Sequence, residues 1–183
     1  MCQHKTCAAL RAANAANSAA VVLVLNYHNK STNTYTWVHA LGQETGGSYA
    51  GQFNLCSGKL EQVDGGCFMK GAIRELAEEF KIQTAFADGT FDALFKGTNG
   101  HIRYIMHHRT SIFIGVLPAG FSRRPIKQAM QSAIANPHLP HSQREMDDFE
   151  YVRLDNGRCI DGRALPVSTY ADAVRRKIDV TTL

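Results

Sequence analysis

The sequence lacks any apolar run long enough to cross a lipid bilayer. The longest one, residues 19–25, is far shorter than the roughly 18 to 20 residues that a transmembrane helix needs. The first 25 residues combine a short basic start with Ala-rich sequence, but Arg11, Asn14 and Asn17 interrupt the stretch, which argues against a secretory leader. We therefore expect no membrane span, no signal peptide and a cytoplasmic location.

Cysteines are few and scattered. The chain has five of them, an odd number, and no two form a CxxC pair. This pattern fits neither a disulfide scaffold nor a zinc site. We therefore expect free thiols in an intracellular protein.

A strong excess of one charge is also absent. The 20 basic and 16 acidic residues give a formal net charge of +4, and the basic excess lies mainly in the last third of the chain. Such a balance permits an anionic ligand but does not require nucleic acid.

The composition is that of a folded domain. Hydrophobic residues make up 44% of the 183 residues, which is enough to form a core and argues against disorder. A chain of this length holds about one domain. We expect that domain to span residues 18–183, after an N-terminal arm or short helix at residues 1–17.

Segments with strand-like and helix-like patterns alternate along the chain. A β-branched run and an aromatic alternating run predict a hairpin at its start, and a helical period appears in the middle. The predicted strands are residues 20–27, 34–41, 52–56, 91–95, 101–107, 110–117 and 149–154, and the predicted helices are residues 67–81, 124–135 and 168–178. Strands in two groups around a central helix indicate an α/β sandwich.

The central helix gathers carboxylates on one side. At 100° per residue, Ala72, Leu76 and Phe80 share an apolar arc, while Glu75, Glu78 and Glu79 fall on the opposite side. Like charges at these spacings cost roughly 0.2 to 0.5 kcal/mol a pair. Clustered carboxylates bind hard divalent cations, and Mg²⁺ brings phosphate oxygens into its remaining coordination positions. The alternative is a solvated acidic face on which Arg74 is an intrahelical partner.

The residues around this helix favour the first interpretation, because they resemble the signature of the Nudix hydrolase family. That signature is a Gly, five residues, a Glu, seven residues, and then Arg-Glu-aliphatic-x-Glu-Glu-x-Gly-aliphatic. Gly58 matches its first position, and the helical half is matched by Arg74, Glu75, Leu76, Glu78, Glu79 and Ile82.

The sequence departs from the signature at three places. Asp64 stands where the first Glu is expected, nine residues instead of seven separate it from Arg74, and Lys81 replaces the second Gly. We expect the two extra residues to enlarge the loop around Gly65 and Gly66. Lys81 removes the residue best suited to a left-handed helix end.

The resemblance implies a fold, a metal site and an activity. The fold would be a Nudix-like α/β/α sandwich with a mixed β-sheet and a central catalytic helix. Glu75, Glu78 and Glu79, with the carbonyl of Gly58, would hold Mg²⁺ or Mn²⁺, and Arg74 would orient the carboxylates. The reaction would be hydrolysis of a diphosphate linkage in a nucleoside diphosphate joined to another moiety, a small-molecule nucleotide being the substrate.

Members of this family often add an acid from the loop before the last strand. Here an acidic stretch, residues 144–150, precedes the last predicted strand, so Glu145 is the first candidate for a further metal ligand or general base, and Glu150 is the second.

Two other functions stay open. A Nudix-fold module could bind a nucleotide or an RNA 5′ end without cleaving it, which the altered spacer and Lys81 favour. An enzyme that removes a cap or diphosphate from RNA would use the C-terminal basic residues. The substrate itself is not encoded in the signature.

Overall fold

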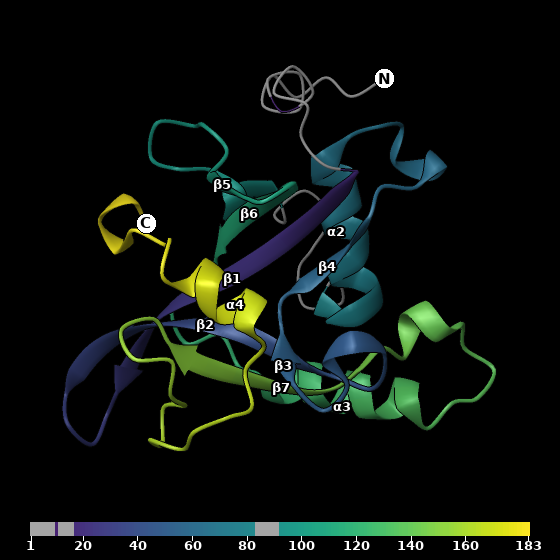
Figure 1. Cartoon of the computed structure of the whole chain (residues 1–183). Coiled ribbons are helices and arrows are strands. Elements are labelled where there is room, and N and C mark those ends of the chain that lie inside the picture. The colour runs from purple at the N-terminus through teal and green to yellow at the C-terminus, as the bar shows by residue number, and fades with distance from the viewer. Residues whose placement is uncertain (1–9, 11–16, 83–91) are drawn as a thin grey trace.

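The computed structural model describes Leu10 and residues 17–82 and 92–183 (Figure 1). Apart from Leu10 and Asn17, the predicted N-terminal arm lies outside the described residues. Leu10 is 2% exposed and belongs to the main hydrophobic cluster. Leu10 precedes the predicted domain, so a residue outside the predicted bounds contributes to the core.

Seven strands and three helices carry the described fold. The strands are β1 (Ser18–Asn29), β2 (Thr34–Glu44), β3 (Phe53–Asn54), β4 (Cys56–Lys59), β5 (Tyr104–His107), β6 (Thr110–Val116) and β7 (Met146–Arg153). The helices are α2 (Phe68–Glu79), α3 (Arg124–Ile134) and α4 (Thr169–Arg175).

Strand β1 is the centre of a mixed sheet. It pairs antiparallel with β2 and β4 and parallel with β6, while β5 continues the sheet beyond β6. On the other side, β2 pairs with β3 and β7. Because β4 pairs with the first residues of β1, the segment that leads into α2 is fixed at that end of the sheet.

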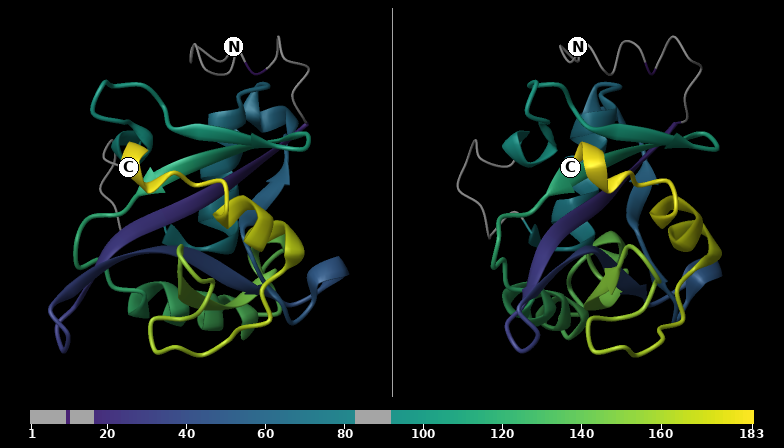
Figure 2. Two further views of the ribbon diagram at one scale, coloured as in Figure 1. Left: turned by 60° about the vertical axis from the view of Figure 1, so that its left-hand side comes forward. Right: turned by 90° about the vertical axis from the view of Figure 1, so that its left-hand side faces the viewer.

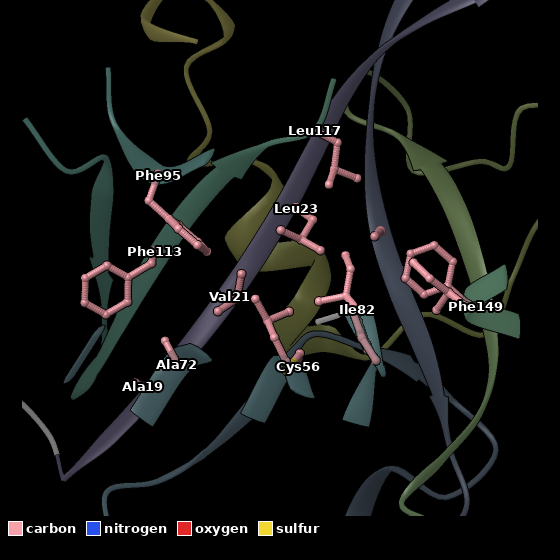
Figure 3. Close-up of a cluster of buried hydrophobic side chains, with 14 of the residues drawn as sticks. Ala19, Val21, Leu23, Cys56, Ala72, Ile82, Phe95, Phe113, Leu117 and Phe149 are labelled. Carbon is pink, nitrogen blue, oxygen red and sulfur yellow. The ribbon is translucent and has the colours of Figure 1, made fainter. Parts of the chain in front are cut away.

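Helices cover both faces of β1, and its sequence shows why. Val21 and Leu23 belong to a cluster that also contains buried residues of α2, whereas Val22 and Val24 belong to a second cluster with buried residues of α4. Figure 3 shows the α2 side of this arrangement, and Figure 2 shows the helices around the sheet. A strand buried on both faces reads as a continuous apolar run, as residues 19–25 do. The predicted α/β sandwich with a mixed sheet is confirmed.

Some element predictions were wrong in detail. A strand was expected at residues 91–95, but Asp92–Phe95 is a 3₁₀ helix and Phe91 lies outside the described residues. Strand β5 begins at Tyr104, three residues later than expected. Strand β7 begins at Met146, three residues earlier than expected, because it pairs with β2 as far as Glu44. Glu145 therefore borders β7, and Glu150 lies within it.

The prediction of free thiols holds for two described cysteines and fails for a third. Cys56 and Cys159 are free and buried, but Cys67, which precedes α2, is disulfide-bonded. Spacing along the chain does not reveal which cysteines the fold brings together.

Among the described residues, no helix combines the length and the apolar character that a bilayer span requires.

The two-sided burial of β1 predicts a large effect of truncation there. Leu23 is fully buried, so Leu23→Ala should lower the free energy of unfolding by about 2 to 5 kcal/mol. Val63→Ala is the control, because Val63 is 73% exposed and its loss should change stability by less than about 0.5 kcal/mol. Denaturant unfolding of the two variants measures both values, and an equal effect would contradict the described core.

Candidate active site

Helix α2 buries two of its carboxylates. Glu75 is 7% exposed and Glu79 is 4% exposed, while the Glu78 side chain is 26% exposed. The sequence-based expectation that all three face away from the packed side of the helix is therefore wrong for Glu75 and Glu79. They lie against β4, which runs beside α2 (Figure 1). A solvated acidic face is excluded.

Gly58 gives the Glu75 carboxylate room to approach the backbone of β4. A Cβ atom at this position would lie 2.0 Å from Glu75 Oε1, which is closer than real atoms come. The first Gly of the signature is thus required by a close approach of carboxylate to strand, and not by a left-handed backbone angle.

Glu79 is bound to the same strand one residue earlier. The backbone N–H of Ser57 donates to Glu79 Oε2 at 3.1 Å, and the Cys56 thiol also hydrogen-bonds this carboxylate. The two carboxylates of α2 therefore lie along consecutive residues of β4.

Arg74 links the acidic side chains that lie next to Glu75. Its guanidinium lies 2.8 Å from Glu75 Oε1 and 3.1 Å from Glu78 Oε2, and it donates to the carbonyl of Lys59 at 2.9 Å. Asp64 lies at 3.2 Å and Glu61 at 3.4 Å from the same guanidinium. Burial lowers the pKa of Arg74, but the hydrogen bond to Asp64 and the nearby carboxylates raise it by more. Arg74 therefore remains a cation and fixes the carboxylates that surround it.

The altered spacer leaves this ion pair intact. Asp64 is 3% exposed and also accepts a hydrogen bond from the backbone N–H of Glu61 at 2.8 Å. The extra residues form a turn at Gly65 and Gly66, whose φ angles are 58° and 68°. Glycine adopts these angles without strain. The shorter acid and the longer loop together keep the carboxylate within reach of Arg74.

The third departure from the signature changes the residue but not the backbone. Lys81 has a φ of 55°, which is the left-handed conformation expected for glycine after a helix. Its ammonium donates to the carbonyl of Glu78 at the end of α2, where a cation suits the helix dipole.

Burial makes the two carboxylates reluctant to ionise. It raises the pKa of Glu75 to about 7, although Arg74 acts against the shift, and Glu78 and Glu145 add to it. Burial also raises the pKa of Glu79 well above its usual range; the Cys56 hydrogen bond opposes this shift, and Glu75, Glu145 and Glu44 increase it. These groups would be stabilised as anions by a nearby positive charge.

Glu145 lies near this cluster, since its charge raises the pKa of Glu75 and Glu79, and its carboxylate lies 3.4 Å from His141 Nδ1. The carbonyl of Glu145 accepts from the backbone N–H of Thr45 at 2.8 Å, which fixes the residue beside the end of β2. Glu150 is 4% exposed and is bound by Arg123, by Lys127 at 2.9 Å and by Arg163 at 3.7 Å. The second candidate acid is already neutralised by three cations.

Glu44 is an acidic neighbour that the sequence did not indicate. It is the last residue of β2, it is half-buried, and it raises the pKa of Glu79. In the sequence it stands at the start of a polar loop, with no spacing that connects it to α2. Only the pairing of strands brings it to the site.

A cavity adjoins the site at Gly58. It has a volume of about 270 Å³ and is lined by Ser57, Gly58, Asn54 and the aromatic rings of Tyr49 and Tyr170. A larger cavity of about 990 Å³ lies around the other end of β1, and its lining contains none of the acids of α2. The smaller cavity touches β4 at Gly58, but its lining likewise contains none of the acids of α2.

In the described part of the chain, no three His, Cys, Asp or Glu side chains are arranged to hold a metal ion. Such an arrangement does not match a preformed metal-binding cage made of protein ligands alone. It is compatible with Mg²⁺, which is usually bound by one or two carboxylates together with water and the phosphates of the substrate.

Comparisons with known proteins found similar solved structures. No family model and no curated protein sequence matches the chain. Among solved structures, the NUDIX domain of Shewanella oneidensis NrtR complexed with ADP ribose is similar, with 11% identity, coverage of 88% of this chain and 84% of that one, and a TM-score of 0.48. A mutT/nudix family protein from Listeria innocua has 14% identity, coverage of 87% and 88%, and a TM-score of 0.44.

A third similar structure is the bifunctional NMN adenylyltransferase/ADP ribose pyrophosphatase from Francisella tularensis, complexed with AMP and a Mn ion. It has 16% identity and a TM-score of 0.43, and the match covers 87% of this chain but 41% of that one. At these scores the similarities describe a related arrangement of elements and assign no activity to this chain.

Proposed function

We propose that this chain is a Nudix-type pyrophosphohydrolase that cleaves a diphosphate linkage in a nucleoside diphosphate joined to another moiety. The observation that carries the proposal is the burial of Glu75 and Glu79 against β4, with Arg74 and Asp64 fixing their surroundings. Burial disfavours the ionised form of both carboxylates, so a cation bound beside them would offset the cost of keeping their charge.

The ligand that fits is a divalent cation, Mg²⁺ or Mn²⁺. The donors available are the carboxylates of Glu75, Glu78 and Glu79 and the carbonyl of Gly58, all oxygen atoms of the kind that hard cations prefer. Gly58 supports this fit, because any side chain there would collide with the Glu75 carboxylate. When bound, the cation would polarise the phosphates and lower the pKa of an attacking water.

The residues of the chain have separate tasks in this reaction. Arg74 holds Glu75 and Glu78 in position through contacts of 2.8 and 3.1 Å. Glu145, which is partly exposed near the buried acids, would accept the proton of the attacking water. The cavity between Tyr49 and Tyr170 has aromatic walls suited to a nucleoside. Hydrolysis by water requires no covalent intermediate with the enzyme.

Binding without cleavage is the second candidate function. It is favoured by the lack of three converging acids among the described residues and by the engagement of Glu75 and Glu78 with Arg74.

RNA binding through the C-terminal basic residues has less support. Arg175 and Arg176 both pair with Asp172, and Lys127 pairs with Asp148 and Glu150. Cations that are already paired offer less to a phosphate backbone.

The first test of the proposal removes one carboxylate charge. Glu79→Gln should lower kcat by about two orders of magnitude or more, because a cation ligand is lost. Its melting temperature should stay the same or rise, since a buried group with a raised pKa is replaced by a neutral one. Asp155→Asn, on an exposed acid paired only with Arg153 in the described contacts, is the matched control. Steady-state kinetics on a panel of nucleoside diphosphate derivatives with Mg²⁺ checks both, and equal activity of Glu79→Gln and wild type would refute the assignment.

A second test uses pH. The folded pKa of Glu75 is about 7 against an ordinary value of 4.5, so the folded state holds a proton that the unfolded state releases in that window. The free energy of unfolding of the metal-free protein should therefore be highest below this window and fall as the pH rises through it. Millimolar Mg²⁺ or Mn²⁺ should restore stability at the upper end, because it binds only the folded state. Thermal unfolding measures both effects, and Glu75→Gln should flatten the pH dependence. A wild-type stability that rises with pH in metal-free buffer would contradict the burial argument.

A third test separates the two candidate acids before and within β7. Glu145→Gln should lower kcat with little change in melting temperature, because Glu145 lies at a loop end and contributes few core contacts. Glu150→Gln should lower the melting temperature with little change in kcat, because it leaves three cations around a neutral side chain. Kinetics and thermal unfolding of both variants decide the question, and a larger loss of kcat in Glu150→Gln would show that the wrong acid was chosen.

A further inference from the structure

Glu44 occupies an irregular position at the edge of the acidic cluster. The β2–β7 ladder runs regularly from Val38 to Gln43 and then shifts register between Gln43 and Glu44. Such bulges redirect a side chain and are common beside active sites. After the shift, Glu44 pairs with Met146, the residue next to Glu145. The irregularity thus sets two acids side by side where β2 and β7 separate.

A chain of hydrogen bonds from Ser168 through Asn54, here called the relay, fixes the Glu44 carboxylate. Asn54 of β3 donates from Nδ2 to Glu44 Oε1 at 3.0 Å, and Ser168 donates from its hydroxyl to Asn54 Oδ1 at 2.8 Å. Asn54 is 2% exposed and Ser168 is fully buried. The hydroxyl of Ser168 in turn accepts from the backbone N–H of Ala171 at 3.0 Å, as the N-cap of α4.

This relay determines which end of the Asn54 amide meets the carboxylate. Ser168 is held at the start of α4, and its hydroxyl occupies the oxygen of the amide, so the NH₂ group of Asn54 points to Glu44. The fold therefore uses two buried polar residues from two separate elements to orient one half-buried acid. Polar networks of this kind are costly unless every member is satisfied, so a purely structural purpose would be served more simply by apolar side chains.

The surroundings of Glu44 are the informative part. Its neighbours there are Glu145, which raises the pKa of Glu44, and Glu79, whose pKa Glu44 raises. Phe80, the residue after Glu79, packs over Gly42 of the same strand: a Cβ at Gly42 would lie 2.9 Å from its ring. This contact packs the residue that follows α2 against β2, the strand that ends in Glu44.

We infer that Glu44 is a further acid of the proposed cation site and that Asn54 and Ser168 are positioning residues that hold its carboxylate there. The inference rests on the proposed function, since it assigns Glu44 to the same cation. Neither the signature around α2 nor the loop before β7 contains these three residues.

The charge of Glu44 can be removed without breaking the relay. In Glu44→Gln the side-chain oxygen still accepts from Asn54, so only the charge is lost. The apparent Kd for Mn²⁺, measured by electron paramagnetic resonance of the free ion, should rise about tenfold, and kcat should fall about tenfold at nearly constant KM. Asp155→Asn is the control and should match the wild type in both measurements.

The relay is tested with Glu44 left in place. Asn54→Asp keeps an acceptor for Ser168 but replaces the donor toward Glu44 by a carboxylate oxygen. This substitution should weaken Mn²⁺ binding. Ser168→Ala removes the hydroxyl and should also weaken Mn²⁺ binding, whereas Ser168→Thr should restore it because the hydroxyl returns. If Asn54→Asp does not fold, the Ser168 pair alone decides the point.

The outcomes separate this inference from the proposed function. If the wild-type protein neither binds Mn²⁺ nor hydrolyses any substrate of the panel, both the inference and the proposed function are refuted. Wild type that binds Mn²⁺, with Glu44→Gln binding it equally well, overturns the inference and leaves the proposed function standing. Relay variants that lose melting temperature but keep the wild-type Kd for Mn²⁺ show a structural role only, and they likewise overturn the positioning role of Asn54 and Ser168.

Discussion

The contact on which the site depends is the close approach of two carboxylates of α2 to the backbone of β4. Glu75 meets the strand at Gly58 and Glu79 meets it at Ser57, and both are withdrawn from water. An isolated charge in such a place costs several kcal/mol, so the carboxylates are tolerable only when protonated, paired or bound to a cation. The sheet supplies this geometry, because β4 is fixed by its pairing with the first residues of β1.

Arg74 offsets part of that cost through its ion pairs. These ion pairs also explain how the chain accommodates its departures from the signature. Arg74 contacts Glu61, Asp64, Glu75 and Glu78 at 2.8 to 3.4 Å, so one cation serves four acids. The turn at Gly65 and Gly66 absorbs two extra residues, and Lys81 takes up a left-handed conformation that glycine would adopt more easily. The departures alter the residues, while the ion pair and the helix end keep their geometry.

The sequence predicted the helix, its acids and the surrounding α/β sandwich, because periodicity and spacing are local properties. It did not predict that Glu75 and Glu79 are buried, since the packing partner β4 is defined only by strand pairing with β1. It also missed Glu44, which reaches the cluster through a register shift between β2 and β7 and through Asn54 and Ser168. Glu150 was the second candidate after Glu145 in the sequence, but the cations that surround it come from the N-cap of α3, from α3 itself and from a later loop.

The most direct test is a crystal structure of the protein grown with Mn²⁺ and a non-hydrolysable nucleoside diphosphate derivative, with the Mn²⁺ located by its anomalous scattering. The ion should lie within roughly 2 to 2.5 Å of carboxylate oxygens of Glu75 or Glu79, with phosphate oxygens of the ligand completing its coordination. A structure with the nucleotide bound and the ion elsewhere, or with Glu75 and Glu79 still buried against β4 without any cation, would contradict the account.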